Sequence, residues 1–198
     1  MRTLIVLAVL ASSSAAHADP FAEIVAGFAF PVSNSNWTNS VDASPVLGVR
    51  AGAMANTGDL GGMLGVDWTP ESLSSSGGSF GFGSTSASLH RFRVIASGVF
   101  HHRVAPKITI SAHAGAGIDI ARASYDVTIL GSTSSGSDSD LGYAFEFGGG
   151  VWFDLGSAQL GIELALPIGH HDKQASQSGD VTFKYSDVDL ELLVGVRL

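Results

Sequence analysis

The chain has 198 residues, enough for one domain of ordinary size, and 45% of them are hydrophobic while only 14% are charged. Its formal net charge of −8 argues against nucleic acid as a partner, because phosphate binding requires clustered Lys and Arg. After the N-terminus no apolar run reaches the roughly 18 residues of a membrane helix, which excludes such a span from the mature chain. Cysteine is absent, so hydrogen bonds and packing must hold the fold.

The first residues have the pattern of a secretory signal peptide. An apolar run from Leu4 to Ala11 follows the basic Arg2 and precedes the small-x-small sequence Ala16-His17-Ala18. A buried N-terminal helix is the alternative, but the cleavage-site chemistry is more specific. We therefore expect a signal peptide at 1–18, no acyl anchor, and one exported domain at 19–198.

The rest of the chain alternates apolar residues with small or polar ones at a period of two, which predicts strands with two different faces. The segments are expected, in chain order, at Ala22–Pro31, Val46–Ala55, Leu60–Trp68, Ser88–His101, Lys107–Arg122, Leu141–Phe153, Ala158–Ile168 and Asp187–Leu198. The register of the alternation persists in all eight segments.

The segment Lys107–Arg122 indicates which face meets which surroundings. Its even positions, from Ile108 to Ile120, are all apolar, whereas its odd positions carry Gly, Ser and Thr with His113 and Asp119. A soluble sandwich would place long charged side chains on its polar face. The small polar face is therefore expected inside and the apolar face outside, the inverse of a soluble lipocalin-like barrel.

The connections between these segments are of two kinds that alternate along the chain. Short turns follow the second, fourth and sixth segments, at Asn56–Asp59, Val104–Pro106 and Asp154–Ser157. Long Ser- and Gly-rich connections follow the others, including Glu71–Ser86 and Gly131–Asp140. Because strands in one continuing register flank each connection, they are read as loops and not as interdomain linkers. Bacterial outer-membrane barrels are built in this way, with the short turns in the periplasm.

This architecture resembles the small outer-membrane β-barrel superfamily, the OmpA/OmpX-like and opacity-type barrels. The resemblance covers Phe21–Leu198 and includes the phrases A-H-A-G-A-G-I-D (112–119) and D-V-D-L-E-L-L-V-G-V-R-L (187–198). It implies an all-β, eight-stranded antiparallel up-and-down transmembrane β-barrel in the outer membrane of a Gram-negative bacterium. One departure is the final Leu198, where such barrels usually end in an aromatic residue that the insertion machinery reads.

The same resemblance implies the partners of the chain. They are outer-membrane lipid and lipopolysaccharide, with periplasmic chaperones and the barrel-insertion machinery during biogenesis, and the protein is expected to be a monomer.

Charged residues with inward parity are the first candidate site. An eight-stranded barrel is just wide enough for side chains to fill its lumen, so these groups are expected to neutralise one another there. The set consists of Arg50, Asp67, Arg91, Arg93, Asp119, Glu146, Glu163, Asp189, Glu191 and Arg197. A static polar core is the favoured interpretation, and a salt-bridge gate in a narrow pore is the alternative.

Two enzymatic interpretations carry less weight. Glu146 and Glu163 are expected on adjacent strands, but a filled lumen admits no substrate for acid–base work. Ser88 and His90 with Glu71 have the residue types of a lipid-A-modifying enzyme near the outer leaflet, yet no family motif groups them. We therefore expect no enzymatic activity and no cofactor.

Histidines and aromatic residues complete the candidates. His170, His171 and Asp172 are placed in the last long loop, but adjacent strand histidines point to opposite faces and chelate poorly, so no metal is predicted. His101 and His102 are placed at the opposite rim. Aromatic belts are expected at both membrane interfaces. Their members are Phe30, Trp68 and Tyr143 toward the long loops, and Phe21, Phe100, Trp152 and Phe153 toward the short turns, with Trp152 sharing the inward parity.

The function expected from these features is structural and interactive. The barrel would present four long surface loops. These loops lack the aromatic and Arg anchors typical of binding hot spots, so their sequence indicates no particular ligand.

Overall fold

A computed structural model describes residues 19–32, 43–55, 58–76, 83–129, 131–171 and 185–198. The expected signal peptide lies outside the described residues. Within the described ranges, no helix is long and apolar enough to cross a membrane.

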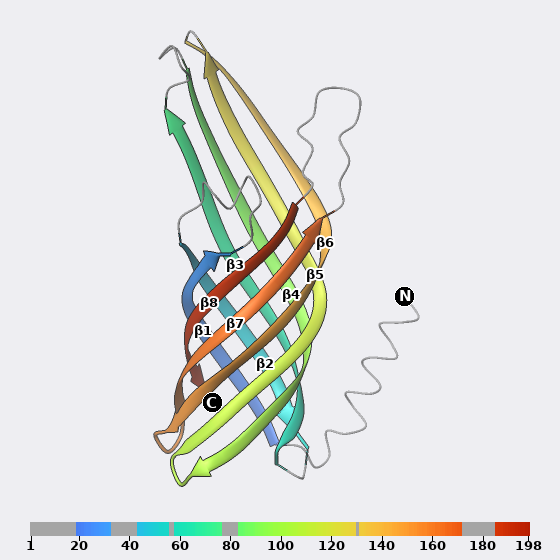
Figure 1. Ribbon diagram of the computed structural model, residues 1–198, viewed down its shortest axis with the longest axis vertical. Coiled ribbons are helices and arrows are strands. Elements are labelled where there is room, and N and C mark those ends of the chain that lie inside the picture. The colour runs from blue at the N-terminus through green and yellow to red at the C-terminus, as the bar shows by residue number, and fades with distance from the viewer. Residues whose placement is uncertain (1–18, 33–42, 56–57, 77–82, 130, 172–184) are drawn as a thin grey trace, which may run out of the picture.

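The described chain forms a closed barrel of eight strands (Figure 1). Each strand pairs antiparallel with the next, and β1 pairs with β8 to close the cylinder. The strands are β1 (Asp19–Pro31), β2 (Ser44–Met54), β3 (Leu60–Ser76), β4 (Gly83–Ala105), β5 (Ile108–Ile129), β6 (Ser132–Asp154), β7 (Gln159–His171) and β8 (Tyr185–Arg197). The prediction of an eight-stranded antiparallel up-and-down barrel is confirmed.

The two faces of the strands meet opposite surroundings. On β7, Ile162 is 55% exposed on the outside, while its neighbour Glu163 is 3% exposed inside the barrel. The same alternation places apolar side chains outside on the other strands, and inside it places most of the buried charged side chains together with small apolar clusters such as Val25, Val46 and Leu193. An apolar exterior and a polar interior are the arrangement of a transmembrane barrel.

Two segments predicted as loops are strands instead. The range 71–86, apart from the undescribed 77–82, belongs to β3 and β4, and the range 132–140 belongs to β6. The prediction failed because Ser, Thr, Gly and Asp predominate in these segments, which removes the apolar periodicity that identifies a strand. Cross-strand backbone hydrogen bonds form without an apolar face.

The extra strand length forms an open sheet beyond the closed barrel. Pairing of β2 with β3 ends at Leu47 and Trp68, and pairing of β6 with β7 ends at Tyr143 and His170. Beyond these pairs only the four central strands continue, and they rise well above the others in Figure 1. The buried Thr69, Glu71 and Arg91 still belong to the end of the barrel interior. We call the part beyond them the projecting sheet, which comprises Ser72–Ser76, Gly83–Ser88, Ser124–Ile129 and Ser132–Ser137.

Tight turns close the opposite end of the barrel. Gly58 and Gly156 adopt φ angles of +81° and +101°, which favour glycine because L side chains are strained there. The backbone N–H of Gly156 donates a hydrogen bond to Oδ1 of Asp154 at 2.8 Å. Pro106 and Lys107 form the turn between β4 and β5.

Trp152 lies inside the barrel and not in an interfacial belt. It is fully buried, and its indole N–H donates to Oγ of Ser111 at 2.9 Å. Gly161 makes room for the ring, since a Cβ there would lie 2.4 Å from Trp152 atoms. Phe21 is also buried, so its predicted place in the belt is wrong, whereas Phe30, Tyr143, Phe100 and Phe153 face outward.

Candidate functional site

All ten charged residues of the predicted set lie inside the barrel. None is more than 7% exposed, and they come from every strand except β1. The ion pairs place nine of them in four groups, named here outer, middle, inner and mouth in order from the projecting sheet toward the short turns, and Asp67 lies beside Arg93 of the middle group.

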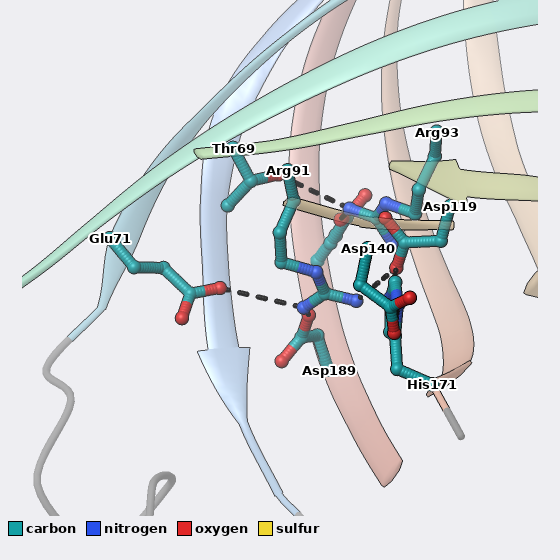
Figure 2. A network of polar contacts seen from close by, with 9 residues as sticks. Thr69, Glu71, Arg91, Arg93, Asp119, Asp140, His171 and Asp189 are labelled. Carbon is teal, nitrogen blue, oxygen red and sulfur yellow. Dashed lines mark hydrogen bonds and ion pairs between the residues drawn. The ribbon is translucent and has the colours of Figure 1, made fainter. Parts of the chain in front are cut away.

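Arg91 is the centre of the outer group (Figure 2). Its Nη2 donates to Oδ2 of Asp119 at 2.9 Å, and its Nη1 donates to Oδ2 of Asp189 at 3.0 Å. Nη1 also lies 3.4 Å from Oε1 of Glu71. One guanidinium thus contacts carboxylates from β3, β5 and β8, which ties together strands on opposite sides of the barrel.

His171 extends the outer group and corrects an earlier expectation. It is not a solvated loop residue but the buried last residue of β7, with Nε2 3.4 Å from Asp119 Oδ2 and Nδ1 3.2 Å from Asp140 Oδ2. His170 points outward against Tyr143, with ring centroids 5.0 Å apart. The two histidines therefore cannot share a metal, and no group of three metal-ligating residues occurs among those the structure describes.

Arg93 forms the middle group. Its Nη2 donates to Oε1 of Glu191 and to Oγ1 of Thr69, the latter at 3.2 Å. Since β4 and β8 are separated by half the circumference, the Arg93–Glu191 pair spans the lumen. Asp67 is the direct cross-strand neighbour of Arg93, and its Oδ1 has no hydrogen-bond partner among the described residues.

The inner group is a ring of four side chains. Arg50 Nη1 donates to Glu163 Oε1 at 2.5 Å, and Arg50 Nη2 lies 3.7 Å from Glu146 Oε1. His113 closes the ring through Nε2, 2.9 Å from Glu146 Oε1, and Nδ1, 3.9 Å from Glu163 Oε2. Both carboxylates that could have formed an acid–base pair are thus engaged by Arg50 and His113.

The mouth group lies at the short-turn end. Arg197 donates from Nε to Glu23 Oε1 at 2.6 Å and from Nη1 to Gln159 Oε1 at 3.1 Å. Its Cζ also lies 3.9 Å from the ring centroid of Trp152, a cation–π contact. Below it, a cavity of about 550 Å³ opens at the mouth and is lined by His101 among others, so His101 faces inward while His102 is exposed.

Acidic residues outnumber arginines in the described interior. Eight carboxylates are buried there against four arginines. Two of the eight, Glu23 and Glu71, were missing from the predicted set. Glu23 has the same parity as Val25 and could have been found from the period of two, whereas Glu71 was assigned to a loop.

The residues considered for lipid modification do not assemble. Glu71 lies inside the barrel in the outer group, whereas His90 faces outward and stacks on Trp68, with centroids 6.1 Å apart and planes within 4°. Ser88 contacts Ser124 through their hydroxyl oxygens at 3.3 Å. The barrel wall separates the histidine from the carboxylate.

Comparisons with known proteins relate the fold to solved barrels. No protein-family model matches the sequence, and no curated protein is similar enough to match. The structure resembles that of neisserial surface protein A, NspA, with a TM-score of 0.51 and 20% identity over 90% of this chain and 96% of that chain.

Two further barrels have lower scores. Ail, the attachment invasion locus protein of Yersinia pestis, has a TM-score of 0.46 and 14% identity over 91% of this chain and 99% of that chain. The outer membrane protein OprG from Pseudomonas aeruginosa has a TM-score of 0.43 and 13% identity over 92% of this chain and 97% of that chain. Ail has also been solved with the heparin analogue sucrose octasulfate. The chain has the fold of the small Gram-negative outer-membrane barrels.

Proposed function

We propose that this outer-membrane barrel is a non-enzymatic surface scaffold that holds the projecting sheet outside the cell. The observation that carries the proposal is the continuation of four strands beyond the closed barrel as a paired sheet. Cross-strand hydrogen bonds order this sheet, unlike a loop, so it offers a fixed surface for interaction. Its partners would be outer-membrane lipid and lipopolysaccharide, and biogenesis would use periplasmic chaperones and the insertion machinery.

The contacts inside the lumen argue against an open pore as the resting state. Arg50 on β2 reaches Glu146 and Glu163 on β6 and β7, and Arg93 on β4 reaches Glu191 on β8. Side chains from opposite walls thus meet across the interior at successive levels. Opening a path would separate buried ion pairs, which is costly when the charges are left without partners.

Cysteine accessibility tests the orientation of the scaffold, and the natural chain contains no cysteine. We expect Ser135→Cys, exposed on the projecting sheet, to react with a membrane-impermeant maleimide in intact cells. Ser157→Cys, in the short turn between β6 and β7, is the matched control and should react only after permeabilisation. Labelling is read by the gel shift of the tagged maleimide.

If Ser157→Cys reacts in intact cells and Ser135→Cys reacts only after permeabilisation, the barrel has the opposite orientation in the membrane and the proposal is wrong. Equal labelling of both variants, together with recovery of the protein in the soluble fraction, would show that the protein does not reside in the membrane. Unboiled and boiled gel mobility of each variant verifies that the barrel has folded.

A further inference from the structure

The cavity at the short-turn end, called here the mouth cavity, does not continue into the lumen. The described residues that line it include none of the inner group. Next to Arg197, which does line it, the fully buried ring of Trp152 lies 3.9 Å from the guanidinium Cζ. This ring extends across β7 and β8, since a Cβ at Gly161 or Gly195 would lie 2.4 or 2.7 Å from its atoms. A small molecule that enters between the short turns therefore stops at Arg197.

Two buried side chains at the deep end of the mouth cavity can bind an anion. Arg197 donates through Nε to Glu23 and through Nη1 to Gln159, and neither contact uses Nη2. His101 is more than nine-tenths buried, and its Nε2 has no hydrogen-bond partner among the described residues. Phe21 contacts both, because its ring centroid lies 5.3 Å from that of His101 and 5.5 Å from Arg197 Cζ. The two nitrogen donors therefore flank the same aromatic ring.

The ion pair of Arg197 with Glu23 does not prevent a second carboxylate from binding. In the outer group one guanidinium, that of Arg91, already contacts carboxylates from three strands. Glu23 is not among the residues that line the mouth cavity. A ligand carboxylate therefore reaches Arg197 from the side that Glu23 leaves open, with the charge-assisted hydrogen bonds that guanidinium groups form best.

The rim of the mouth cavity carries the opposite charge. Asp19, Asp59 and Asp154 line it, and Asp154 pairs with Arg103 at 3.5 Å. Asp19 and Asp59 are exposed and have no arginine or lysine partner within the described residues, since the ion-pair contact of Asp59 is with His102. The cavity thus has cationic donors at its deep end and carboxylates at its rim.

We propose that the mouth cavity binds a short peptide by its free carboxyl end. The terminal carboxylate contacts Arg197 Nη2 and His101 Nε2, a small apolar side chain lies against Phe21, and the free amino group lies near Asp19 and Asp59. The cavity volume of about 550 Å³ is within the range of roughly 300 to 1,000 Å³ that small-ligand sites occupy. A peptide with free ends has the same order of charge as the cavity, whereas a polyanion is repelled by the rim.

NMR titration of the refolded barrel in uncharged maltoside micelles tests the proposal, with trialanine and trialanine amide as probes. We expect the wild type to bind trialanine about tenfold more tightly, the effect of one charge-assisted hydrogen bond. The amide is the more positively charged probe, so attraction to the rim alone would favour it instead. A preference for trialanine therefore reports the contact at the deep end.

Two variants remove the deep donors, and a third is the matched control. His101→Phe keeps a ring beside Phe21 but has no Nε2, and it should lose most of the preference for trialanine. Glu23→Gln together with Arg197→Gln neutralises both partners of a buried pair, so no charge is left unpaired, and it should abolish the preference. Lys107→Ala removes an exposed cation at the same end that does not line the cavity, and it should keep the preference.

A further pair of measurements tests the rim. N-acetyl-trialanine lacks the amino charge and should bind the wild type more weakly than trialanine does. Asp19→Asn together with Asp59→Asn should remove this difference and leave the preference for trialanine over its amide. If the difference persists in this variant, the rim carboxylates do not belong to the site.

Three results would overturn the proposal: no binding of trialanine, equal affinity of the wild type for trialanine and its amide, or an unchanged preference in His101→Phe and in the double glutamine variant. Heat-dependent gel mobility establishes that each variant has folded. The peptide contact is independent of the orientation of the barrel, and only its place in the periplasm rests on the proposed function. Inverted cysteine labelling with an intact preference for trialanine would refute the proposed function alone, whereas the expected labelling without that preference would refute the peptide site alone.

Discussion

Buried guanidinium groups determine how the polar interior is satisfied. Arg91 and Arg93 are 1% exposed or less, and each contacts a carboxylate on β8. Charges removed from water to this extent are tolerated only when they are paired and hydrogen-bonded. The stability of the barrel therefore depends on keeping each arginine with its partner more than on the number of ion pairs.

Removing the carboxylate of Glu191 should leave the charge of Arg93 buried without its ion-pair partner. We expect Glu191→Ala to lower the free energy of unfolding in micelles by about 3 to 5 kcal/mol, measured by guanidinium unfolding followed by Trp fluorescence. Glu191→Gln keeps a hydrogen-bond acceptor and should lose less.

Asp59 provides the matched control, since it pairs with His102 at 3.5 Å where both side chains are about half exposed. Asp59→Ala should cost less than about 1 kcal/mol because water screens an exposed pair. A loss for Glu191→Ala no larger than that of this control would contradict the burial argument.

Sequence reasoning at this scale identified inward charges by parity but not their contacts. His171 was assigned to a loop because the apolar alternation weakens after Ile168, although three more residues continue β7. Its partners Asp119 and Asp140 lie on β5 and β6, far from His171 in sequence. His171 is buried because β7 and its alternation continue to this residue. The polarity of the neighbouring residues does not show where the strand ends.

At the scale of elements, the closed part of the barrel that crosses the membrane, called here the membrane segment, and the projecting sheet are stabilised by different interactions. In the membrane segment, outward apolar residues meet lipid, and inward polar residues meet one another. In the projecting sheet, serine and threonine predominate on the outer face, and order comes from cross-strand backbone pairing between β3, β4, β5 and β6. Only the membrane segment has a periodic hydrophobic pattern in its sequence, which explains why most of the projecting sheet was not predicted as strand.

Shortening the projecting sheet should therefore leave the barrel intact. Deleting residues 125–128 together with 133–136 removes an even number from each of β5 and β6, so the faces and the turn at Gly131 are preserved. We expect this variant to reach the outer membrane and to show heat-dependent gel mobility.

Deleting 113–116 together with 145–148 is the matched control within the membrane segment. It removes the same number of paired residues, and with them the inner-group residues His113 and Glu146, and should prevent folding. Failure of the first deletion to fold would mean that the projecting sheet contributes to barrel stability.

At the scale of the whole molecule, the seam between β1 and β8 turns a sheet into a closed barrel. Ala26 and Val194 are cross-strand partners at this seam, and both face outward. Closure leaves no free strand edge at the level of the membrane, where unpaired backbone groups would be costly. The ion pair of Arg197 with Glu23 also joins the last strand to the first at this seam.

Cysteines placed across the seam should cross-link if the barrel is closed. We expect Ala26→Cys with Val194→Cys to lose its free thiols under oxidising conditions, measured by mass spectrometry. Ala26→Cys with Val151→Cys is the control, because Val151 lies in the same outward row but on β6, three strands from β1. Free thiols in the first pair, or cross-linking in the second, would contradict the closure.

The sequence by itself determined the two faces of the membrane segments and the number of strands. This was possible because a period of two is local, so each residue's face follows from its neighbours alone. Only the tertiary structure decided which charges meet, since Arg91 and Asp189 are 98 positions apart and come together through closure and strand stagger. It also decided that four strands continue beyond the membrane, because backbone pairing there leaves no hydrophobic pattern to read.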